Sequence, residues 1–376
     1  MTFRTGALDG LVIADFGRVL AGPYATMLLA DLGAEVVKVE RPEVGDDTRS
    51  WGPPWVGDES SYFLSVNRNK RSVAYDLTDD TGLDAARELV ARADVVVENF
   101  LPGTMDRLGL GHDAVRDLNP DVVYCSVTGF GGQNQLPGYD LLIQAVGGLM
   151  SITGPDPRTP TKVGVAMVDI ITGLHAAVGI LAALRHRDRT GEGQRIEVNL
   201  LSSLLSALAN QSSAYVAAGV VPHAMGNRHP SIAPYEVFAA SDRPLVLAIG
   251  NDRQFAALAD VLGRPELASD ERFSTNRARV AHREVLTAML NEALAADTAD
   301  AWFTALTAKR VPCGPLNDIA DAIALAERLG LEPVITIDDP RRADPIRQVA
   351  NPIRLSATPP TYRSAPPRLD EGGDGA

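Results

Sequence analysis

The sequence has few cysteines and no cluster of metal-binding side chains. Only two of its 376 residues are cysteine, Cys125 and Cys313, and neither lies in a CxxC motif or beside a pair of histidines. Chains that depend on disulfide bonds or on a structural zinc ion carry their cysteines in such patterns. We therefore expect neither a disulfide framework nor a metal site, and we interpret both cysteines as small core residues.

Positive charge is also scarce. Lys and Arg number 35 against 48 Asp and Glu, which gives a formal net charge of −13. Nonspecific binding to nucleic acid or to an anionic membrane requires a basic surface, so neither partner is expected. A local group of cations nevertheless occurs near the amino end: Lys38, Arg41, Arg49, Arg68, Lys70 and Arg71. These side chains form either a solvated rim or a binding site for an anionic ligand.

Long apolar runs are absent as well. The longest, AAVGILAAL at 176–184, is too short to span a bilayer, and the first residues do not read as a secretory signal. We expect a cytoplasmic protein without a membrane-spanning segment. The hydrophobic content of 45% is enough for a substantial core, in two domains or in one large domain with an insertion.

The first half of the chain alternates strand-like and helical segments. Apolar runs predict strands at 11–16, 35–40, 72–77, 94–100 and 122–131. This rhythm is typical of βαβ units, so we predict an α/β fold with a Rossmann-like parallel sheet covered by helices on both faces. In such sheets ligands bind in the loops that follow the carboxyl ends of the strands.

The glycine fingerprint of dinucleotide enzymes is missing from the first of these loops. It reads GRVLAGP, and Pro23 removes a backbone donor from the start of the helix. The loop therefore argues against a nicotinamide enzyme. The backbone N–H groups of Val19 to Gly22 remain available for another ligand.

The second half is organised differently. From about 169 to 217 the pattern is mostly helical, with one strand in GEGQRIEVNLL at 191–201, and a segment rich in Pro, Gly and His follows. We predict that 1–224 form the first part of the large domain and that 225–325 form a smaller α+β domain. Residues 326–376 would return to the large domain and end in an extended, proline-rich tail.

Two loops carry candidate ligand-binding cations. After the strand at 94–100, the chain enters a helix through Pro102 and Gly103, with Arg107 one turn further on. Exposed helix N–H groups beside an arginine suit a phosphate, although the pattern alone favours Arg107 as a plain surface residue. The loop GNRHPSIAPYEVF brings Arg228 and His229, which could bind a substrate carboxylate or be incidental.

Asp169 is a single carboxylate in the apolar stretch VAMVDIITGL, at the start of a predicted helix. Burial of its ionised form would be costly, so its presence requires an explanation. It could cap the helix by accepting a hydrogen bond from a backbone N–H. It could also be a nucleophile that attacks an activated carbonyl to give a mixed anhydride. The pattern alone favours the cap, and the two roles are compatible.

Eight stretches taken together resemble the type III CoA-transferase family, also called the CaiB/BaiF family. They run in order from about residue 10 to 355: VIADFGRVLAGPYATMLLADLGAEVVKVERPEVGDDTR, NRNKRSVAYDL, ADVVVENFLPGTMDRLGL, NPDVVYCSVTGFG, PGYDLLIQAVGGLMSITG, VDIITGLHAAVGILAAL, GNRHPSIAPYEVF and RVPCGPLNDIADA. Each stretch alone is a weak match, but eight in sequence are highly specific. The resemblance implies a large α/β domain, a smaller domain and an interlocked homodimer.

The resemblance also implies a site and a chemistry. Asp169 matches the catalytic aspartate, which would attack an acyl-CoA thioester, form an acyl anhydride and then an aspartyl-CoA thioester. CoA is thus a substrate, and no tightly bound cofactor is expected. CoA contacts fall on Val19, Leu20, Ala21, Arg41, Asn99, Phe100 and Arg107, and substrate contacts on Tyr139, Arg228, His229, Gly250 and Asn251. Oxyanion donors are expected in the loop from Val19 to Gly22 or near Gly250.

The substrates are less well defined. Members that act on formyl and oxalyl groups carry a run of glycines where this chain has AIGNDRQF, with Gly250 alone. GNDRQF and NRHPSIAPYEVF look more like members that use succinyl-CoA and dicarboxylic acids.

Two other functions stay open. One is an α-methylacyl-CoA racemase of the same superfamily, whose histidine is expected near GYDLLIQ, where this chain has Tyr139. His112, in the nearby GHD, falls in a different predicted helix. The other is a noncatalytic CoA-binding subunit, against which the retention of Asp169 argues.

Overall fold

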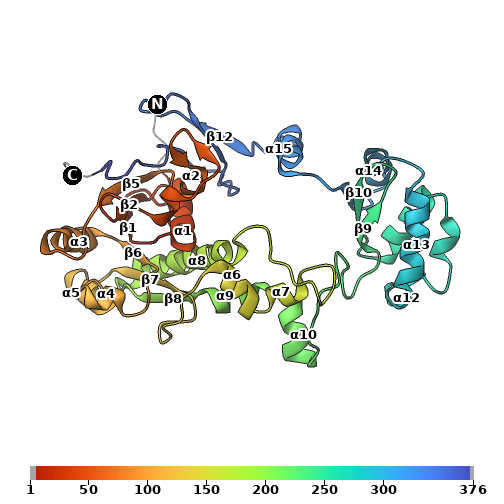
Figure 1. Ribbon diagram of the computed structural model, residues 1–376, viewed down its shortest axis with the longest axis horizontal. Coiled ribbons are helices and arrows are strands. Elements are labelled where there is room, and N and C mark those ends of the chain that lie inside the picture. Colours follow the sequence, from red (N-terminus) through yellow and green to blue (C-terminus); the bar gives the residue numbers. More distant parts are fainter. Residues whose placement is uncertain (1–5, 373–376) are drawn as a thin grey trace. The chain divides into compact units, whose positions relative to one another are not determined.

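The structure, a computed structural model, describes residues 6–372 as two compact units (Figure 1). The larger unit contains 6–149, 162–221 and 332–372, and the smaller contains 150–161 and 222–331. The sequence assigned 222–224 and 326–331 to the large domain, but both belong to the smaller unit. It also assigned 150–161 to the large domain. In the structure this segment lies with the smaller unit, because the N–H groups of Ala224 and Gly226 donate to the carbonyls of Ser151 and Gly154, both at 3.0 Å.

A six-stranded parallel sheet forms the centre of the larger unit and confirms the predicted Rossmann-like architecture. Its spatial order is β5-β2-β1-β6-β7-β8. The strands are β1 (Val12–Asp15), β2 (Glu35–Glu40), β5 (Lys70–Ala74), β6 (Val95–Glu98), β7 (Val123–Thr128) and β8 (Arg195–Asn199). The order reverses between β1 and β6, which opens a crevice at the carboxyl ends of these two strands.

Helices cover both faces of this sheet, since successive strand residues point to opposite sides. Ile13 of β1 packs into a core formed with α1 (Ala21–Asp31) and α8 (Met167–Thr190). Its neighbour Ala14 packs into a second core on the opposite face, with α3 (Asp80–Arg92) and α5 (His112–Leu118). The remaining elements of this unit are β3 (Trp55–Val56), β4 (Glu59–Ser60), α2 (Ser61–Ser65), α4 (Thr104–Arg107), α6 (Asp140–Val146), α9 (Leu200–Ala207), α10 (Asn210–Ala218), β12 (Val334–Ile337) and β13 (Ile346–Val349).

Helix α8 is more apolar than the sequence pattern suggested. By length and composition alone its 24 residues could cross a membrane. Val168, Ala176, Ile180 and Leu184 are however buried in the core against α1 and the sheet. We therefore interpret α8 as the central helix of the domain, with an apolar outer face.

The carboxyl-terminal segment returns to the larger unit and covers an edge of its sheet. Arg363 donates to the carbonyls of Ala30, Gly33 and Ala34 at the end of α1, at 2.7–2.9 Å. The N–H of Ala74 on β5 donates to Asp370 at 2.9 Å, and another hydrogen bond joins Gly372 to the carbonyl of Ser72. The edge strand thereby gains partners that protect it from pairing with another chain.

The smaller unit is α+β. A three-stranded antiparallel sheet, ordered β11-β10-β9, packs against helices around a core that includes Phe238, Leu245, Phe255 and Leu290. Its elements are β9 (Tyr235–Ala239), β10 (Pro244–Ala248), α11 (Asp252–Val261), α12 (Asn276–Ala281), α13 (Arg283–Leu294), α14 (Ala299–Ala308), β11 (Cys313–Pro315) and α15 (Ile319–Arg328), and the short α7 (Leu149–Ile152) spans the first join between the units.

Candidate active site

A cavity of about 270 Å³ opens at the crevice of the parallel sheet and contains Asp169. Loops after four neighbouring strands line it. These are Arg18 to Ala21 after β1, Asn99 to Pro102 after β6, Thr128 and Gly129 at the end of β7, and Leu200 after β8, joined by 136–139. The cavity therefore lies where ligands bind in sheets of this topology.

Asp169 does not cap helix α8, so that interpretation is wrong. It lies in the first turn, two residues inside the helix start at Met167. The Oδ1 atom of Asp140 instead accepts the N–H groups of Val168 at 2.8 Å and of Asp169 at 3.4 Å. Over residues 6–372, no side chain or N–H group donates a hydrogen bond to the Asp169 carboxylate. This carboxylate is therefore available for chemistry.

Helix α6 holds the segment that leads into α8. Gln144, one turn after Asp140, donates to Asp140 Oδ2 at 2.6 Å and accepts the N–H of Val163 at 2.9 Å. Asp140 and Gln144, four residues apart on α6, thus hold both ends of the segment from Val163 to Val168 that precedes Asp169. Sequence reasoning missed Asp140 and Gln144, although both lie within the quoted stretch GYDLLIQ.

The environment of Asp169 makes its carboxylate a stronger base than usual. Burial and the neighbouring Asp140 carboxylate raise the pKa of Asp169 to about 7. Both causes disfavour the ionised form. Burial together with the charges of Asp169, Asp140 and Asp46 likewise raises the pKa of Tyr62 to about 12. At neutral pH Asp169 is therefore partly ionised, and its ionised form is a better nucleophile than an ordinary carboxylate.

Apolar side chains surround this region and limit the access of water. Leu20, Met27 and Val66 are buried, and Tyr62 and Ile170 pack against them. The ring of Trp51 meets that of Tyr62 edge to face, with centroids 5.4 Å apart. Sequence analysis also missed Tyr62, because an aromatic residue in a short helix gives no signal of its own.

The loop after β1 has fewer free backbone N–H groups for an oxyanion than the sequence predicted. The N–H of Val19 donates to the carboxylate of Asp46, and that of Gly250 donates to Gln254 at 2.9 Å, so neither is free for an oxyanion. Leu20 and Ala21 line the cavity, and their N–H groups have no acceptor within the described part of the chain. These two N–H groups are the remaining candidates from this loop.

A larger cavity of about 660 Å³ adjoins the first and shares Arg18 and Phe100 with it. The Arg18 guanidinium lies 5.0 Å from the centre of the Phe100 ring. Arg41 lines the larger cavity, as does Thr104, which accepts a hydrogen bond from the exposed Arg107 at 3.1 Å. The two cavities together offer an extended site with cations along it.

The predicted CoA contacts on this side fall into two groups. Val19, Leu20, Ala21, Asn99 and Phe100 line the smaller cavity, and Arg41 lines the larger one. Asn99 also clamps the loop, because its amide accepts the N–H of Arg18 at 2.8 Å and donates to the Arg18 carbonyl at 2.7 Å. Arg107 lines neither cavity but binds Thr104, which lines the larger one.

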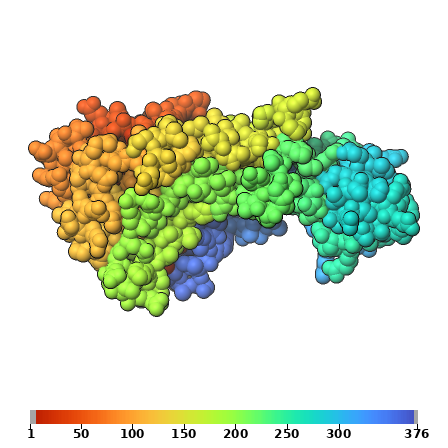
Figure 2. Space-filling model, turned by 90° about the horizontal axis from the view of Figure 1, so that it is seen from below, coloured from red at the N-terminus to blue at the C-terminus, as the bar shows by residue number. Residues whose placement is uncertain are grey.

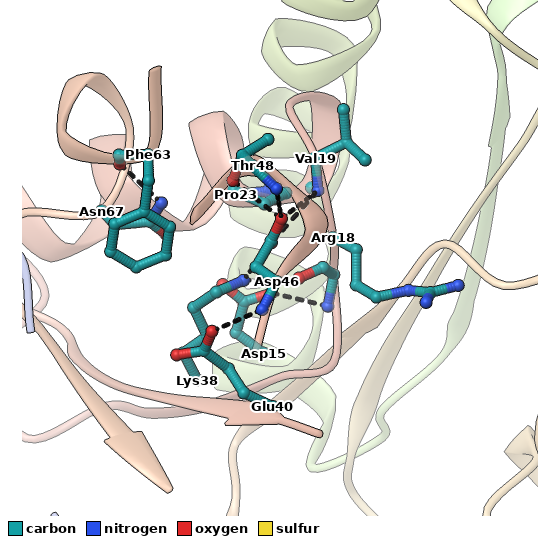
Figure 3. Close-up of polar contacts among 12 residues, drawn as sticks. Asp15, Arg18, Val19, Pro23, Lys38, Glu40, Asp46, Thr48, Phe63 and Asn67 are labelled. Carbon is teal, nitrogen blue, oxygen red and sulfur yellow. Dashed lines mark hydrogen bonds and ion pairs between the residues drawn. The ribbon is translucent and has the colours of Figure 1, made fainter. Parts of the chain in front are cut away.

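Most of the group of cations near the amino end forms neither a solvated rim nor an anion site. Four of the six bind carboxylates of the larger unit in buried or half-buried ion pairs: Lys38 with Asp46, Arg49 with Glu40, Arg68 with Asp31, and Lys70 with Asp15. Figure 3 shows the first of these pairs. Arg41 remains half-exposed at the larger cavity, where it binds Asp47 at 2.5 Å.

The predicted substrate contacts are divided between the two units. Tyr139 lines the Asp169 cavity and is exposed. Arg228, in the smaller unit, is bound by Glu236 at 3.3 Å and by Glu284 at 2.5 Å. His229 Nδ1 accepts the N–H of Ser231 at 3.1 Å.

Asn251 caps α11 by accepting the N–H of Gln254 at 2.9 Å. Each of these residues of the smaller unit, like Gly250, therefore has a local partner. The roles of Arg228, His229, Gly250 and Asn251 in substrate binding stay predictions.

Comparison with known proteins assigns the chain to a class. Residues 8–373 match CoA-transferase family III. The chain is 43% identical to a succinate–glutarate CoA-transferase of Agrobacterium fabrum, over 99% of this chain and 95% of that protein. It is 40% identical to an acetyl-CoA:oxalate CoA-transferase of Acetobacter aceti, over 98% of this chain and 94% of that protein.

Among solved structures, a CaiB/BaiF family protein from Brucella suis has a TM-score of 0.86 at 44% identity, with 98% of both chains covered. The protein is therefore an enzyme of the CoA-transferase class. It belongs to CoA-transferase family III, and the resemblance seen in the sequence is confirmed.

The raised pKa of Asp169 predicts a pH dependence. For a reaction that uses the ionised carboxylate, kcat/KM should rise with pH through an apparent pKa near 7. Asp140→Asn keeps an oxygen acceptor for the start of α8 but removes the like charge, which lowers the pKa of Asp169. The rise in kcat/KM should therefore move to lower pH, and initial rates from pH 4 to pH 9 measure it.

The matched control is Asp113→Asn, which changes a fully exposed side chain and should leave the profile in place. An unchanged profile in Asp140→Asn would contradict the assignment of this charge as a cause of the raised pKa.

Proposed function

We propose that the protein transfers CoA from an acyl-CoA donor to a carboxylic acid acceptor, with Asp169 as the nucleophile. The observation that carries the proposal is the state of the Asp169 carboxylate. It lies in the cavity at the strand ends, has no hydrogen-bond donor within the described residues, and has a pKa raised to about 7. A structural aspartate would be paired or hydrogen-bonded instead.

The reaction proceeds through two kinds of aspartyl intermediate. The Asp169 carboxylate attacks the thioester carbonyl carbon, and the C–S bond breaks. CoA departs as a thiolate, and the acyl group stays on Asp169 as an anhydride. The thiolate then attacks the Asp169 carbonyl carbon, which releases the donor carboxylate and forms an aspartyl-CoA thioester. The acceptor carboxylate attacks the carbonyl carbon of that thioester, the C–S bond breaks, and CoA thiolate leaves while an anhydride forms between the acceptor and Asp169. The thiolate then attacks the acceptor's carbonyl carbon, which gives the acceptor acyl-CoA and releases the Asp169 carboxylate.

Each attack places negative charge on a carbonyl oxygen. The free N–H groups of Leu20 and Ala21, which line the same cavity, are the donors that we assign to this oxygen. One such donor is typically worth about 3 to 4 kcal/mol of transition-state stabilisation. No step requires a metal ion or a redox cofactor.

The two adjoining cavities suit the two ends of CoA. We place the thioester beside Val19, Leu20 and Ala21, and the nucleotide portion in the larger cavity. Its apolar wall, which includes Val39, Leu77 and Leu108, can contact a base, while Arg41 and Arg107 can bind phosphate groups.

For substrates, we propose dicarboxylic acids, with succinyl-CoA as the first donor to test. The printed names of both relatives include a dicarboxylic acid, glutarate in one and oxalate in the other. Succinate appears with glutarate, whereas the oxalate enzyme is named for acetyl-CoA. Both donors therefore belong in the assay.

The racemase alternative is not favoured by the site. Proton exchange at an α-carbon would use a histidine beside the aspartate, but no described residue lining the Asp169 cavity is a histidine. His112 instead begins α5 and packs against Tyr124, with ring centroids 5.9 Å apart.

Removal of the nucleophile tests the proposal. Asp169→Asn keeps the shape of the side chain but cannot form the anhydride, so transfer should fall by at least a thousandfold while CoA binding persists. The assay incubates the protein with succinyl-CoA or acetyl-CoA and a panel of mono- and dicarboxylic acids, and follows new CoA esters by mass. Asp113→Asn serves as the control. Near-normal transfer by Asp169→Asn would defeat the assignment, and solvent deuterium entering a 2-methylacyl-CoA would favour the racemase.

The arginines at the larger cavity give a second prediction. Asp47 binds Arg41 at 2.5 Å and lies 3.8 Å from Arg18, so its carboxylate competes with any phosphate for these cations. Asp47→Asn should lower the KM for the acyl-CoA about two- to fivefold, because exposed ion pairs are weak. Arg107→Ala should raise the KM with little change in kcat. Unchanged KM values in both variants would contradict this placement of the phosphates.

We also propose that the enzyme is a homodimer, as the family resemblance implies. Large apolar side chains of α8 and α10 are exposed, among them Val178 at 65% and Val216 at 82%. Figure 2 shows yellow-green atoms of this part of the chain over a broad area of the larger unit. An apolar surface of this kind marks a protein interface.

Light scattering at micromolar concentration should therefore give about twice the mass of the chain, which is 40.0 kDa. Val178→Glu together with Val216→Glu should shift the species toward the monomer. A monomeric wild-type protein would contradict the proposal.

A further inference from the structure

The geometry points to Asp46 as a positioning residue that fixes the loop after β1 in its active form. This inference rests on the proposed function, because the loop residues Leu20 and Ala21 carry the N–H groups assigned to the oxyanion. Asp46 is buried and lines the larger cavity, but not the cavity that contains Asp169. It acts through the backbone of Val19, the residue that precedes Leu20.

Val19 has a backbone conformation that its side chain disfavours. Its φ is +67°, in the left-handed region that glycine adopts readily and that β-branched residues strongly avoid. Such a conformation persists only where surrounding contacts impose it. Helix α1, which follows at once, begins without a side-chain cap from the described residues. The required contact must therefore come from elsewhere.

Asp46 supplies this contact. Its two carboxylate oxygens lie 3.2 and 3.3 Å from the N–H nitrogen of Val19. The same carboxylate accepts from Lys38 Nζ at 2.9 Å, from the Thr48 N–H at 3.0 Å and from Thr48 Oγ1 at 2.8 Å (Figure 3). Asp46 is only 1% exposed and Lys38 is fully buried. The carboxylate is thus itself held in place on several sides.

The neighbouring peptide groups of the loop are fixed in the same way. Lys38 Nζ also donates to the Gly17 carbonyl at 2.8 Å, and Asp15 accepts the Gly17 N–H at 2.9 Å. The Asn99 amide binds both backbone groups of Arg18. Side chains from the ends of β1, β2 and β6 therefore hold three consecutive residues, and the chain enters the cavity at Leu20 in one orientation.

Asp46 and Lys38 hold the loop as a charged ion pair. Burial alone would raise the pKa of Asp46, but the Lys38 ammonium and the bonds from Thr48 hold it well below the usual range. Burial alone would lower the pKa of Lys38, but nearby carboxylates, first that of Asp46, keep it above its usual value. The pair therefore stays ionised at every pH at which the enzyme is assayed.

The test is Asp46→Asn, which keeps the size of the side chain but removes the charge that faces Lys38. In steady-state assays with succinyl-CoA, we expect kcat to fall at least tenfold while the KM for succinyl-CoA stays within threefold. Loss of an interaction made only in the transition state lowers kcat and leaves KM nearly unchanged, whereas loss of ground-state binding raises KM. Asp31→Asn is the matched control, since Asp31 is equally buried and binds Arg68, Asn69 and Asn351, none of them in this loop. It should lower Tm but leave kcat within twofold.

Val19→Gly provides the second arm of the test. Glycine adopts a positive φ without penalty, so the loop should depend less on Asp46 in this background. The loss of kcat caused by Asp46→Asn should therefore shrink at least threefold when position 19 is glycine. A loss of equal size in both backgrounds would overturn the inference, as would a kcat for Asp46→Asn within twofold of that for Asp31→Asn.

If Asp46→Asn does not fold, Thr48→Val tests the inference instead. This substitution removes one hydrogen-bond donor to the Asp46 carboxylate and keeps the ion pair between Asp46 and Lys38. A kcat loss of about threefold with unchanged KM supports the inference, and an unchanged kcat overturns it. The proposed function fails separately, since wild-type protein without transfer refutes CoA transfer, whereas an active wild type with a fully active Asp46→Asn refutes only the role of Asp46.

Discussion

The site depends on one acceptor atom, Oδ1 of Asp140, which binds the first N–H groups of helix α8. This contact satisfies the helix start without the use of Asp169, although Asp169 is closer in sequence. It also places a second carboxylate beside Asp169. The same Asp140 side chain therefore provides both an ordered helix start and a neighbouring carboxylate, Asp169, with a raised pKa.

The buried ion pairs of the larger unit are costly to form, and they also hold part of the site in place. Each takes two charges out of water, which costs more free energy than a surface pair and requires good geometry. Lys38 with Asp46, and Lys70 with Asp15, meet this requirement at 2.9 and 3.0 Å with full burial of both side chains. These pairs also hold the loop after β1, because Asp15 accepts the N–H of Gly17, Lys38 donates to the Gly17 carbonyl, and Asp46 accepts the N–H of Val19.

The sheet could be predicted from the sequence because its signal is local. Apolar runs buried on both faces mark the strands, and their alternation with helical segments implies parallel pairing. The expected strand at 35–40 coincides with β2, whereas the expected strand at 72–77 begins two residues late relative to β5. Charged residues at the start of β5, Lys70 and Arg71, hid its true beginning, since Lys70 is buried only because Asp15 neutralises it.

The site could be predicted only in part, because its decisive contacts join residues far apart in sequence. Asp169 could be found by its isolation among apolar residues and by the family resemblance. The cap from Asp140 comes from 29 residues away, and Asp15 and Lys70 are 55 residues apart. Composition could count the six cations near the amino end but could not show that most of them bind carboxylates of the same domain.

The proposed transfer depends on covalent acylation of Asp169. The most direct measurement is to mix the enzyme with succinyl-CoA, quench within milliseconds to seconds, and map the peptides by mass spectrometry. We expect an adduct on the peptide that contains Asp169, either succinyl or CoA, which disappears when the acceptor acid is added and is absent from Asp169→Asn. Rapid transfer of CoA with no adduct at Asp169 at any time, or an equal adduct in the Asn variant, would rule out Asp169 as the nucleophile.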